Sequence, residues 1–162
     1  MTTDLSTRPR ELARYDVVLT RVFDATREDV FDAWSSEERA LRWFGPDSYP
    51  AVSFEMDFRP GGLFELCMRG PNGEEARSQG RYLEIVAPER IVLTTWIEHE
   101  GAVVFEVLQT VTFTDLGEQT ELTLEHRVTR NDGFPGAEGA QPGWEQTLAR
   151  LAAYVEGGTT AP

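Results

Sequence analysis

A chain of 162 residues with 40% hydrophobic and 27% charged residues has the size and composition of one globular domain with its own core. Its formal net charge of -13 opposes binding to nucleic acid or to anionic membranes, because both need a basic surface. No apolar run reaches the roughly 20 residues of a membrane-spanning helix. The polar N-terminus has no apolar segment typical of a signal peptide, so we expect a cytoplasmic protein.

Scarce residue types narrow the possible chemistry. The single cysteine, Cys67, excludes an internal disulfide and a zinc site built from several cysteines. Two histidines, His99 and His126, are too few for a typical metal site when their predicted surroundings differ. The chain has no lysine, which excludes a Schiff-base lysine and the lysine of a phosphate-binding loop. We therefore expect no metal and no cofactor.

The N-terminal quarter of the chain predicts an arm, a strand and two short helices. Residues 1–14 are polar and are expected to be a flexible arm. Residues 15–24 are rich in β-branched and aromatic side chains, which predicts a strand. Thr26 is placed to cap a helix that runs to about Trp34. A serine then caps a second short helix that passes through Trp43.

The middle of the chain predicts consecutive strands separated by turn residues. Turn signals such as Pro60-Gly61-Gly62 and Asn72-Gly73 recur between apolar alternating segments. Short turns between successive strands favour an antiparallel meander. The predicted strands lie near 50–58, 62–69, 75–87, 90–98, 103–115 and 119–130.

The C-terminal part predicts one long helix. Residues 131–142 are rich in Gly, Pro and Asp and are expected to form a loop. From Gln141 or Gly143 to about Glu156 the apolar residues recur at helical spacing. Residues 158–162 are expected to be a disordered tail, which leaves 15–157 as a single domain.

This order of elements indicates an α+β fold with a cavity. One face of a wide antiparallel sheet must be covered, and the C-terminal helix is the only long element available to cover it. A single helix is too narrow for so wide a sheet. A curved sheet wrapped around that helix would leave space between the two, which predicts an internal cavity.

Motifs along residues 15–156 resemble a known superfamily. They are 30–34 (VFDAW), 41–46 (LRWFGP), 57–62 (DFRPGG), 69–73 (RGPNG), 80–85 (GRYLEI), 88–91 (PERI), His126, and Gly143-Trp144 with Leu148 and Leu151. Taken together and in this order, they resemble the START-like, SRPBCC or helix-grip superfamily. Within it, the chain is similar to the bacterial branch named for homology to the activator of the heat-shock-protein-90 ATPase.

The resemblance implies a fold more firmly than a function. It implies a START-like, Bet v 1-like helix-grip fold, in which a curved antiparallel sheet of about seven strands wraps around the C-terminal helix. Two short helices follow the first strand. It also implies binding of a small hydrophobic or amphipathic molecule, without naming the ligand, because this fold hosts many roles. The family name adds the alternative of a stress-linked co-chaperone.

Strand alternation assigns side chains to the two faces of the sheet. In 120–128, the residues Leu122, Leu124 and His126 share one face, and the apolar character of that face makes it the inner one. His126 therefore points toward the predicted cavity. The same rule places Gln109 and Phe113 inside, together with Phe64, Leu66 and Met68. Tyr82 and Trp96 are also assigned to the inner face, although bulges can shift such long strands.

The predicted pocket combines apolar walls with few polar groups, which is typical of small-molecule sites. Its walls are Phe54, Met56, Phe64, Leu66, Met68, Trp96, Phe113, Trp144 and Leu148, its polar contacts are His126, Gln109 and Tyr82, and its mouth is formed by Trp43 and Phe44. The alternative is a filled core in which these aromatic rings pack on each other.

The sequence leaves alternative roles open for several residues. His126 is a core histidine with a backbone or tyrosine partner, a hydrogen-bonding anchor for a ligand, or the acid or base of an enzyme of the cyclase or hydratase kind. Trp43 and Phe44 form either a lid over a ligand or a plug that seals the helix pair to the sheet. Asp57 and Arg59 are expected to brace a hairpin turn. Free sheet edges are compatible with a monomer or a weak homodimer.

Overall fold

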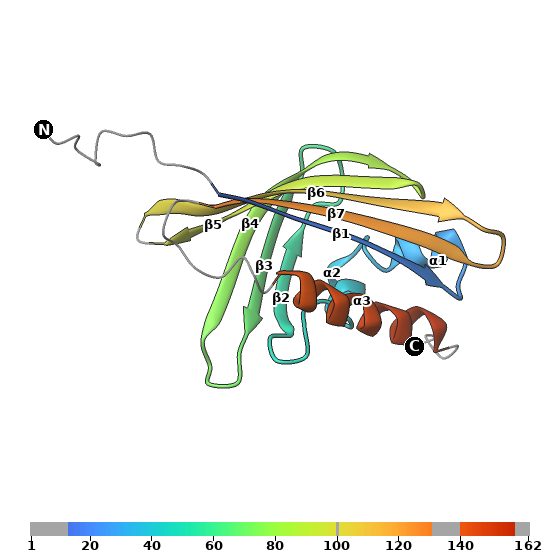
Figure 1. The fold of residues 1–162 in the computed structure, drawn as a ribbon, viewed down its shortest axis with the longest axis horizontal. Helices are drawn as coiled ribbons and strands as arrows, with labels where there is room; N and C mark the ends of the chain where they lie inside the picture. The colour runs from blue at the N-terminus through green and yellow to red at the C-terminus, as the bar shows by residue number, and fades with distance from the viewer. Residues whose placement is uncertain (1–12, 100, 131–139, 158–162) are drawn as a thin grey trace, which may run out of the picture.

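The computed structural model describes residues 13–99, 101–130 and 140–157, which form one curved sheet and three helices (Figure 1). The strands are β1 (Ala13–Phe23), β2 (Ala51–Met56), β3 (Leu63–Arg69), β4 (Glu75–Val86), β5 (Arg90–His99), β6 (Ala102–Asp115) and β7 (Thr120–Arg130). The helices are α1 (Arg27–Asp32), α2 (Glu37–Ala40) and α3 (Ala140–Glu156).

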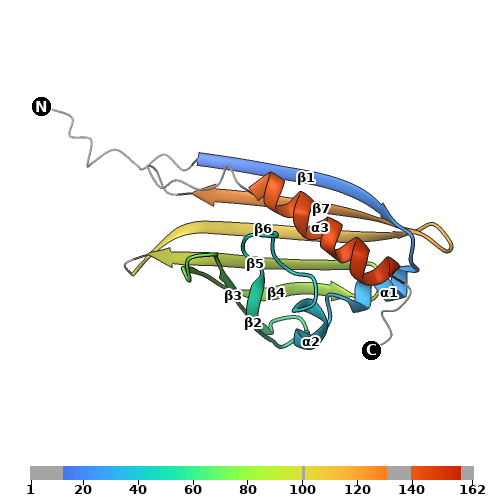
Figure 2. The ribbon, with the colours of Figure 1, turned by 90° about the horizontal axis from the view of Figure 1, so that it is seen from below.

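The seven strands form a single antiparallel sheet in the order β1-β7-β6-β5-β4-β3-β2. Strands β2 to β7 make the predicted meander, and β1 pairs with β7 along eleven residues. The sheet bends strongly, so that β2 and β3 descend from the layer that contains β6, β7 and β1, and α3 lies on the concave side (Figure 1). Seen from below, α3 runs across the face of the sheet (Figure 2). The predicted helix-grip architecture is confirmed.

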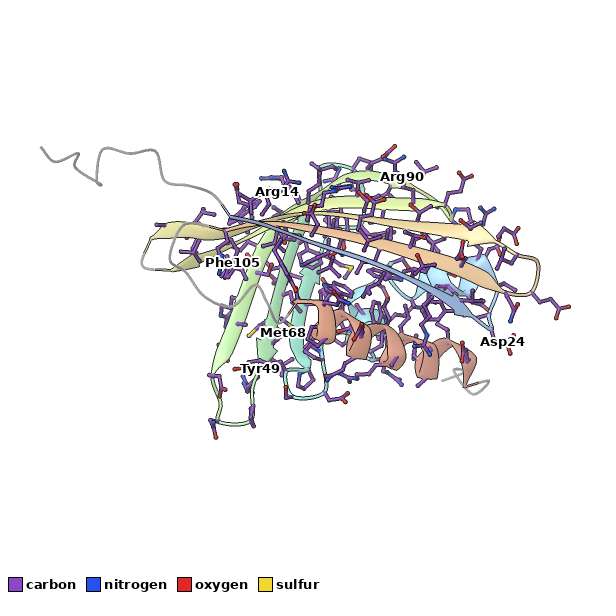
Figure 3. All side chains as sticks on the ribbon, in the orientation of Figure 1. Arg14, Asp24, Tyr49, Met68, Arg90 and Phe105 are labelled. Carbon is purple, nitrogen blue, oxygen red and sulfur yellow. The ribbon has the colours of Figure 1, made fainter. Side chains whose placement is uncertain are left out.

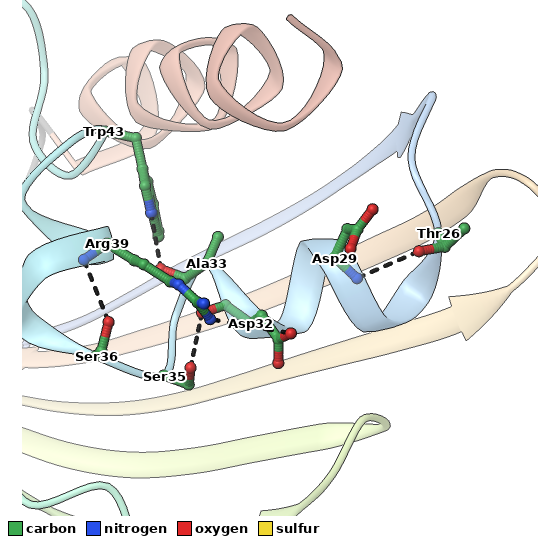
Figure 4. A network of polar contacts seen from close by, with 8 residues as sticks. All are labelled: Thr26, Asp29, Asp32, Ala33, Ser35, Ser36, Arg39 and Trp43. Carbon is green, nitrogen blue, oxygen red and sulfur yellow. Dashed lines mark hydrogen bonds and ion pairs between the residues drawn. The ribbon is translucent and has the colours of Figure 1, made fainter. Parts of the chain in front are cut away.

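Side-chain caps define the starts of the two short helices (Figure 4). The hydroxyl of Thr26 accepts from the backbone N–H of Asp29 at 3.3 Å, and Ser36 accepts from Arg39 at 3.2 Å. Helix α2 ends at Ala40, earlier than predicted, because the chain turns there. This turn folds Trp43 back toward α1.

The core lies between the inner face of the sheet and the buried face of α3. Apolar residues of both elements pack there with aromatic side chains from α1, α2 and the loop that follows α2. Figure 3 shows these side chains crowding the space beside α3, with Arg90 on the opposite, outer side of the sheet. Helix α3 buries Trp144, Thr147, Leu148, Leu151 and Ala152.

The register corrects the predicted position of Trp96. Trp96 pairs with Gln79 on β4 and with Glu106 on β6, whereas Tyr82 and Leu93 form the inner row. Because Ile91 and Leu93 are buried against the core, the two-residue period of β5 places Trp96 on the outer face. The prediction that Trp96 forms a wall of the pocket is therefore wrong.

Several predictions at the ends of the chain lie outside the described residues. Residues 1–12 of the predicted arm, the predicted tail 158–162 and residues 131–139 of the predicted loop are among them. Residues 13 and 14, also expected in the arm, instead begin β1, which pairs with β7. Residues 140–142, expected in that loop, instead form the first turn of α3. None of the described helices is long and apolar enough to cross a membrane.

Candidate functional site

One row across the inner face of the sheet carries three polar side chains and one leucine. Tyr82, Leu93, Gln109 and His126 lie opposite one another on β4, β5, β6 and β7. This row crosses a face that is otherwise apolar, and alternation predicted three of its four members there. Trp144 of α3 lies above the row, with its ring centroid 5.7 Å from that of His126.

A cluster of aromatic rings fills the space between this row and the helices. Phe44 is central to it, with its ring 5.1 Å from that of Phe54 and 5.4 Å from that of Trp144. Phe54 in turn contacts Phe64 at 5.5 Å. Trp34 stacks on Trp144 at 6.3 Å. The three contacts made by the phenylalanine rings are edge-to-face, and both edge-to-face and stacked contacts stabilise a packed core.

The aromatic cluster leaves one small cavity of about 20 Å³. This volume suits a single water molecule, since about 10–15 Å³ is the minimum for one. Its lining consists of Trp34, Ala40, Trp43, Phe44, Phe54, Met56, Phe64, Tyr82, Ile91, Leu93 and Gln109. In this conformation the aromatic side chains occupy most of the space that the sequence predicted as a pocket.

The predicted site residues are distributed around this cavity as follows. Those that line it are Trp43, Phe44, Phe54, Met56, Phe64, Tyr82 and Gln109. Leu66, Phe113, Trp144 and Leu148 belong to the surrounding core, and Met68 packs against it. His126 reaches the lining through Gln109. Sequence reasoning missed Trp34, Ala40, Ile91 and Leu93 as lining residues, although burial of Trp34 could have been inferred from its spacing after Val30.

The polar groups of the site are few. His126 Nδ1 lies 2.8 Å from Gln109 Oε1, and because an amide oxygen only accepts, Nδ1 carries the proton of this bond. The Tyr82 hydroxyl donates to Met56 Sδ at 3.6 Å, a weak acceptor. Trp34 Nε1 is buried without a partner. The site can therefore position a polar group of a guest molecule.

Burial keeps the ionisable groups of the site neutral. It lowers the pKa of His126 to about 4, because the imidazolium would lose its hydration. It also raises the pKa of Tyr82 above its usual range for the same reason. No carboxylate or guanidinium is part of the cavity lining given above. The candidate site is therefore uncharged at neutral pH.

The lowered pKa of His126 predicts weaker folding stability in acid. Between pH 6.5 and about 4 the unfolded chain binds a proton on His126 that the folded protein does not bind, so stability falls as the pH falls. Above pH 6.5 this contribution is constant. We expect a loss of at most about 1.4 kcal/mol for each pH unit in that window. Urea unfolding at several pH values measures it.

The matched variant for this prediction is His126→Gln, which removes the titrating ring and keeps a polar side chain. All other titrating groups are common to the two proteins, so the difference between their pH slopes isolates His126. We expect a shallower slope for the variant between pH 6.5 and 4. Equal slopes would show that His126 is protonated in the folded protein as readily as in the unfolded chain.

Hydrogen bonds to α3 and to the end of α1 hold the loop after α2 in place at the rim of the cavity. Arg150 Nη1 donates to the carbonyl oxygen of Gly45 at 2.9 Å. The backbone N–H of Asp47 donates to Gln146 Oε1 at 3.0 Å. These two bonds fasten the loop that carries Phe44 to α3. The fully buried Trp43 donates its indole N–H to the carbonyl of Ala33 at 2.9 Å, so it is a plug, whereas Phe44 lies at the rim.

A larger hollow of about 340 Å³ lies over β2, β3 and β4. Most of its lining residues alternate outward, among them Glu55, Glu65 and Arg77, which are exposed. Cys67 also lies in this row and is buried. Asp57 and Arg59 pair at 2.7 Å beside the following turn and brace it as expected. Among the described residues no group of three or more His, Cys, Asp or Glu side chains could hold a metal ion.

Comparisons with known proteins agree on the fold. A family model described as Activator of Hsp90 ATPase homolog 1-like protein matches residues 24–156. A solved structure from Rhizobium leguminosarum is similar, with 26% identity over 92% of this chain and 99% of that chain and a TM-score of 0.80. No curated protein matches the chain.

Two further solved structures have similar scores. Protein CV1439 from Chromobacterium violaceum has 29% identity, covers 87% of this chain and 96% of that chain, and has a TM-score of 0.78. The Mll3558 protein from Rhizobium loti has 26% identity, covers 88% of this chain and 98% of that chain, and has a TM-score of 0.76. In each case the similarity extends over nearly the whole domain.

Proposed function

The chain belongs to the family of Activator of Hsp90 ATPase homolog 1-like proteins, within the START-like superfamily, and on that premise we propose that it binds a small hydrophobic or amphipathic molecule between its sheet and α3. The observation that carries the proposal is an uncharged cavity with aromatic walls, and the inner face of the sheet contributes Tyr82 and Gln109 to its lining. An apolar enclosure with a few polar groups is the usual form of a small-molecule site.

A ligand larger than water must displace side chains, because the cavity has a volume of only about 20 Å³. Phe44 and Met56 are the wall residues best suited to move. Both are half-buried, Phe44 is carried by a loop, and Met56 has a flexible side chain. The loop is held to α3 by the two bonds from Gln146 and Arg150. Each such bond contributes about 1 kcal/mol, so opening is energetically accessible.

The two alternatives have less support. An enzymatic role for His126 would usually need a carboxylate to orient the ring, whereas the ring is oriented by the neutral amide of Gln109. We therefore assign His126 a positioning role in this proposal. The co-chaperone alternative has only the description of the family behind it. A monomeric or weakly dimeric state, and a cytoplasmic location, stay predictions.

Removal of a hydrogen bond that holds the Phe44 loop to α3 is expected to speed ligand entry. The probe is N-phenyl-1-naphthylamine, an uncharged molecule whose fluorescence rises in apolar surroundings. We expect saturable binding with one molecule per chain, and an association rate roughly 3- to 10-fold higher in Arg150→Met, which loses about one hydrogen bond to the loop. Stopped-flow fluorescence measures both quantities.

Arg127→Met is the matched control, because Arg127 lies on the outer face and pairs with Asp16 and Glu125 away from the cavity. Its association rate is expected to equal that of the unmodified protein. Native mass spectrometry of the purified protein adds an independent test, since a retained ligand appears as a mass adduct. A protein that shows neither an adduct nor saturable probe binding does not have the proposed function.

A further inference from the structure

The indole N–H of Trp34 is unusual among the buried polar groups. Trp34 is only 7% exposed and lines the cavity, yet its Nε1 has no hydrogen-bond partner. An indole nitrogen can only donate, so it can be satisfied only by an acceptor. A buried donor without a partner costs about 1–3 kcal/mol. The neighbouring Trp43, in contrast, has the carbonyl of Ala33 as its acceptor.

A second donor of the same cavity is poorly satisfied. The Tyr82 hydroxyl is a donor at neutral pH, and its acceptor is the sulfur of Met56 at 3.6 Å. The one amide oxygen of the lining, Oε1 of Gln109, is already engaged by His126. The lining therefore has more hydrogen-bond donors than acceptors. A guest that brings an oxygen acceptor would correct this imbalance.

The charge of the lining limits that acceptor to a neutral one. The residues around the cavity are apolar, aromatic or uncharged polar, and no cationic side chain belongs to them. A carboxylate would be buried there without a counter-charge, which costs several kcal/mol. A carbonyl, ether or hydroxyl oxygen carries no such cost. The volume of about 20 Å³ accommodates one oxygen-sized group before any side chain moves.

We propose that the ligand of this cavity is an uncharged molecule with an oxygen acceptor, and that this oxygen accepts the N–H of Trp34. This inference rests on the proposed function, since it names the class of molecule that the same cavity takes. The apolar part of the molecule replaces Phe44 and Met56 at the rim. Its oxygen reaches the Trp34 N–H as these side chains move, because that nitrogen is fully buried in the present conformation.

Three probes of similar size separate the contributions of an oxygen acceptor and of a negative charge to binding. Acetophenone carries a carbonyl oxygen, cumene lacks one, and benzoate carries a charge. We expect acetophenone to bind roughly 3- to 10-fold more tightly than cumene, the range that one hydrogen bond supplies, and benzoate not to saturate. Titrations followed by ¹H–¹⁵N NMR of the indole groups give the affinities, and acetophenone is expected to shift the Trp34 indole proton downfield.

Two variants assign the effect to one side chain. Trp34→Phe keeps an aromatic ring and loses the donor, so the preference for acetophenone over cumene is expected to disappear. Trp96→Phe removes an indole from the outer face of the sheet and is expected to retain the preference. The missing resonance of each variant also assigns the two indole signals.

The outcomes distinguish this inference from the proposed function. Equal affinities of acetophenone and cumene, saturable binding of benzoate, or an unchanged preference in Trp34→Phe would each overturn the inference while leaving a functional cavity. Failure of all three probes to saturate, together with the absence of binding of N-phenyl-1-naphthylamine, would overturn both. The expected order of affinities with its loss in Trp34→Phe supports both.

Discussion

Replacement of Trp43 by alanine is expected to lower the free energy of unfolding by about 4 kcal/mol, the range measured for large aromatic-to-alanine changes in protein cores. Trp43 is fully buried, and its ring contacts Trp34 at 4.8 Å and Phe44 at 5.2 Å. Its indole N–H is the partner of the Ala33 carbonyl, which connects the loop to the end of α1 (Figure 4). The substitution removes packing and this hydrogen bond together. Urea unfolding measures the loss.

Two further variants show how the stability loss of Trp43→Ala arises. Phe44→Ala, at the half-buried rim, is expected to lose only about 2 kcal/mol, because part of this ring is already in contact with solvent. Trp43→Phe keeps most of the packing, leaves the Ala33 carbonyl without its partner and is expected to lose about 2 kcal/mol, so it stays measurable if Trp43→Ala fails to fold. Equal losses in Trp43→Ala and Phe44→Ala would contradict the assignment of Trp43 as plug and Phe44 as rim.

Much of the fold could be predicted because local signals agreed with one another. Turn residues separated the strands, and serine and threonine caps marked the starts of the short helices. The ends of elements were less predictable. Helix α2 stops at Ala40 because the following turn lets Trp43 reach Ala33, a tertiary contact that no local signal encodes.

The candidate site was predictable where the period of two was unbroken. Alternation along β6 and β7 placed Gln109 and His126 inside, and the structure pairs them at 2.8 Å. The assignment of Trp96 was wrong because residues 91–93 are all apolar, so the sequence pattern leaves open which alternate residues of β5 face the core. The pairing of Leu93 with the inner row places Trp96, three residues later, on the outer face.

The size of the cavity could not be predicted at all. The number of strands and helices indicated an uncovered region, but the free volume depends on how individual rings pack. Phe44 contacts Phe54 and Trp144 in that region, from a loop that two bonds to α3 hold in place. Whether the space between the sheet and α3 is filled by side chains or can hold a ligand therefore depends on a few contacts at the rim rather than on the fold.

Replacement of Gly62 by alanine is expected to cost about 3 kcal/mol, a typical upper value for forcing an extra methyl into a packed site. Gly62 is buried, and a methyl group there would overlap the backbone carbonyl of Asp57. The backbone of Gly62 also bonds to Arg59 at 2.8 Å and, through its carbonyl, to the N–H of Tyr82 at 3.0 Å. Relief of the overlap must therefore move the turn away from the strand that carries Tyr82. Urea unfolding measures the loss of stability.

The adjacent Gly61 is the matched control for this turn. It has a φ of +82° but no atom within 4 Å of an added methyl group, so Gly61→Ala meets backbone strain and no overlap. That strain costs about 1 kcal/mol, because an L-residue is disfavoured in the left-handed region. The two glycines thus separate conformational from steric cost within one motif. If Gly62→Ala lowers the free energy of unfolding no more than Gly61→Ala does, the turn can move at little cost. The wall of the cavity at Tyr82 would then be more deformable than its hydrogen bonds to the turn indicate.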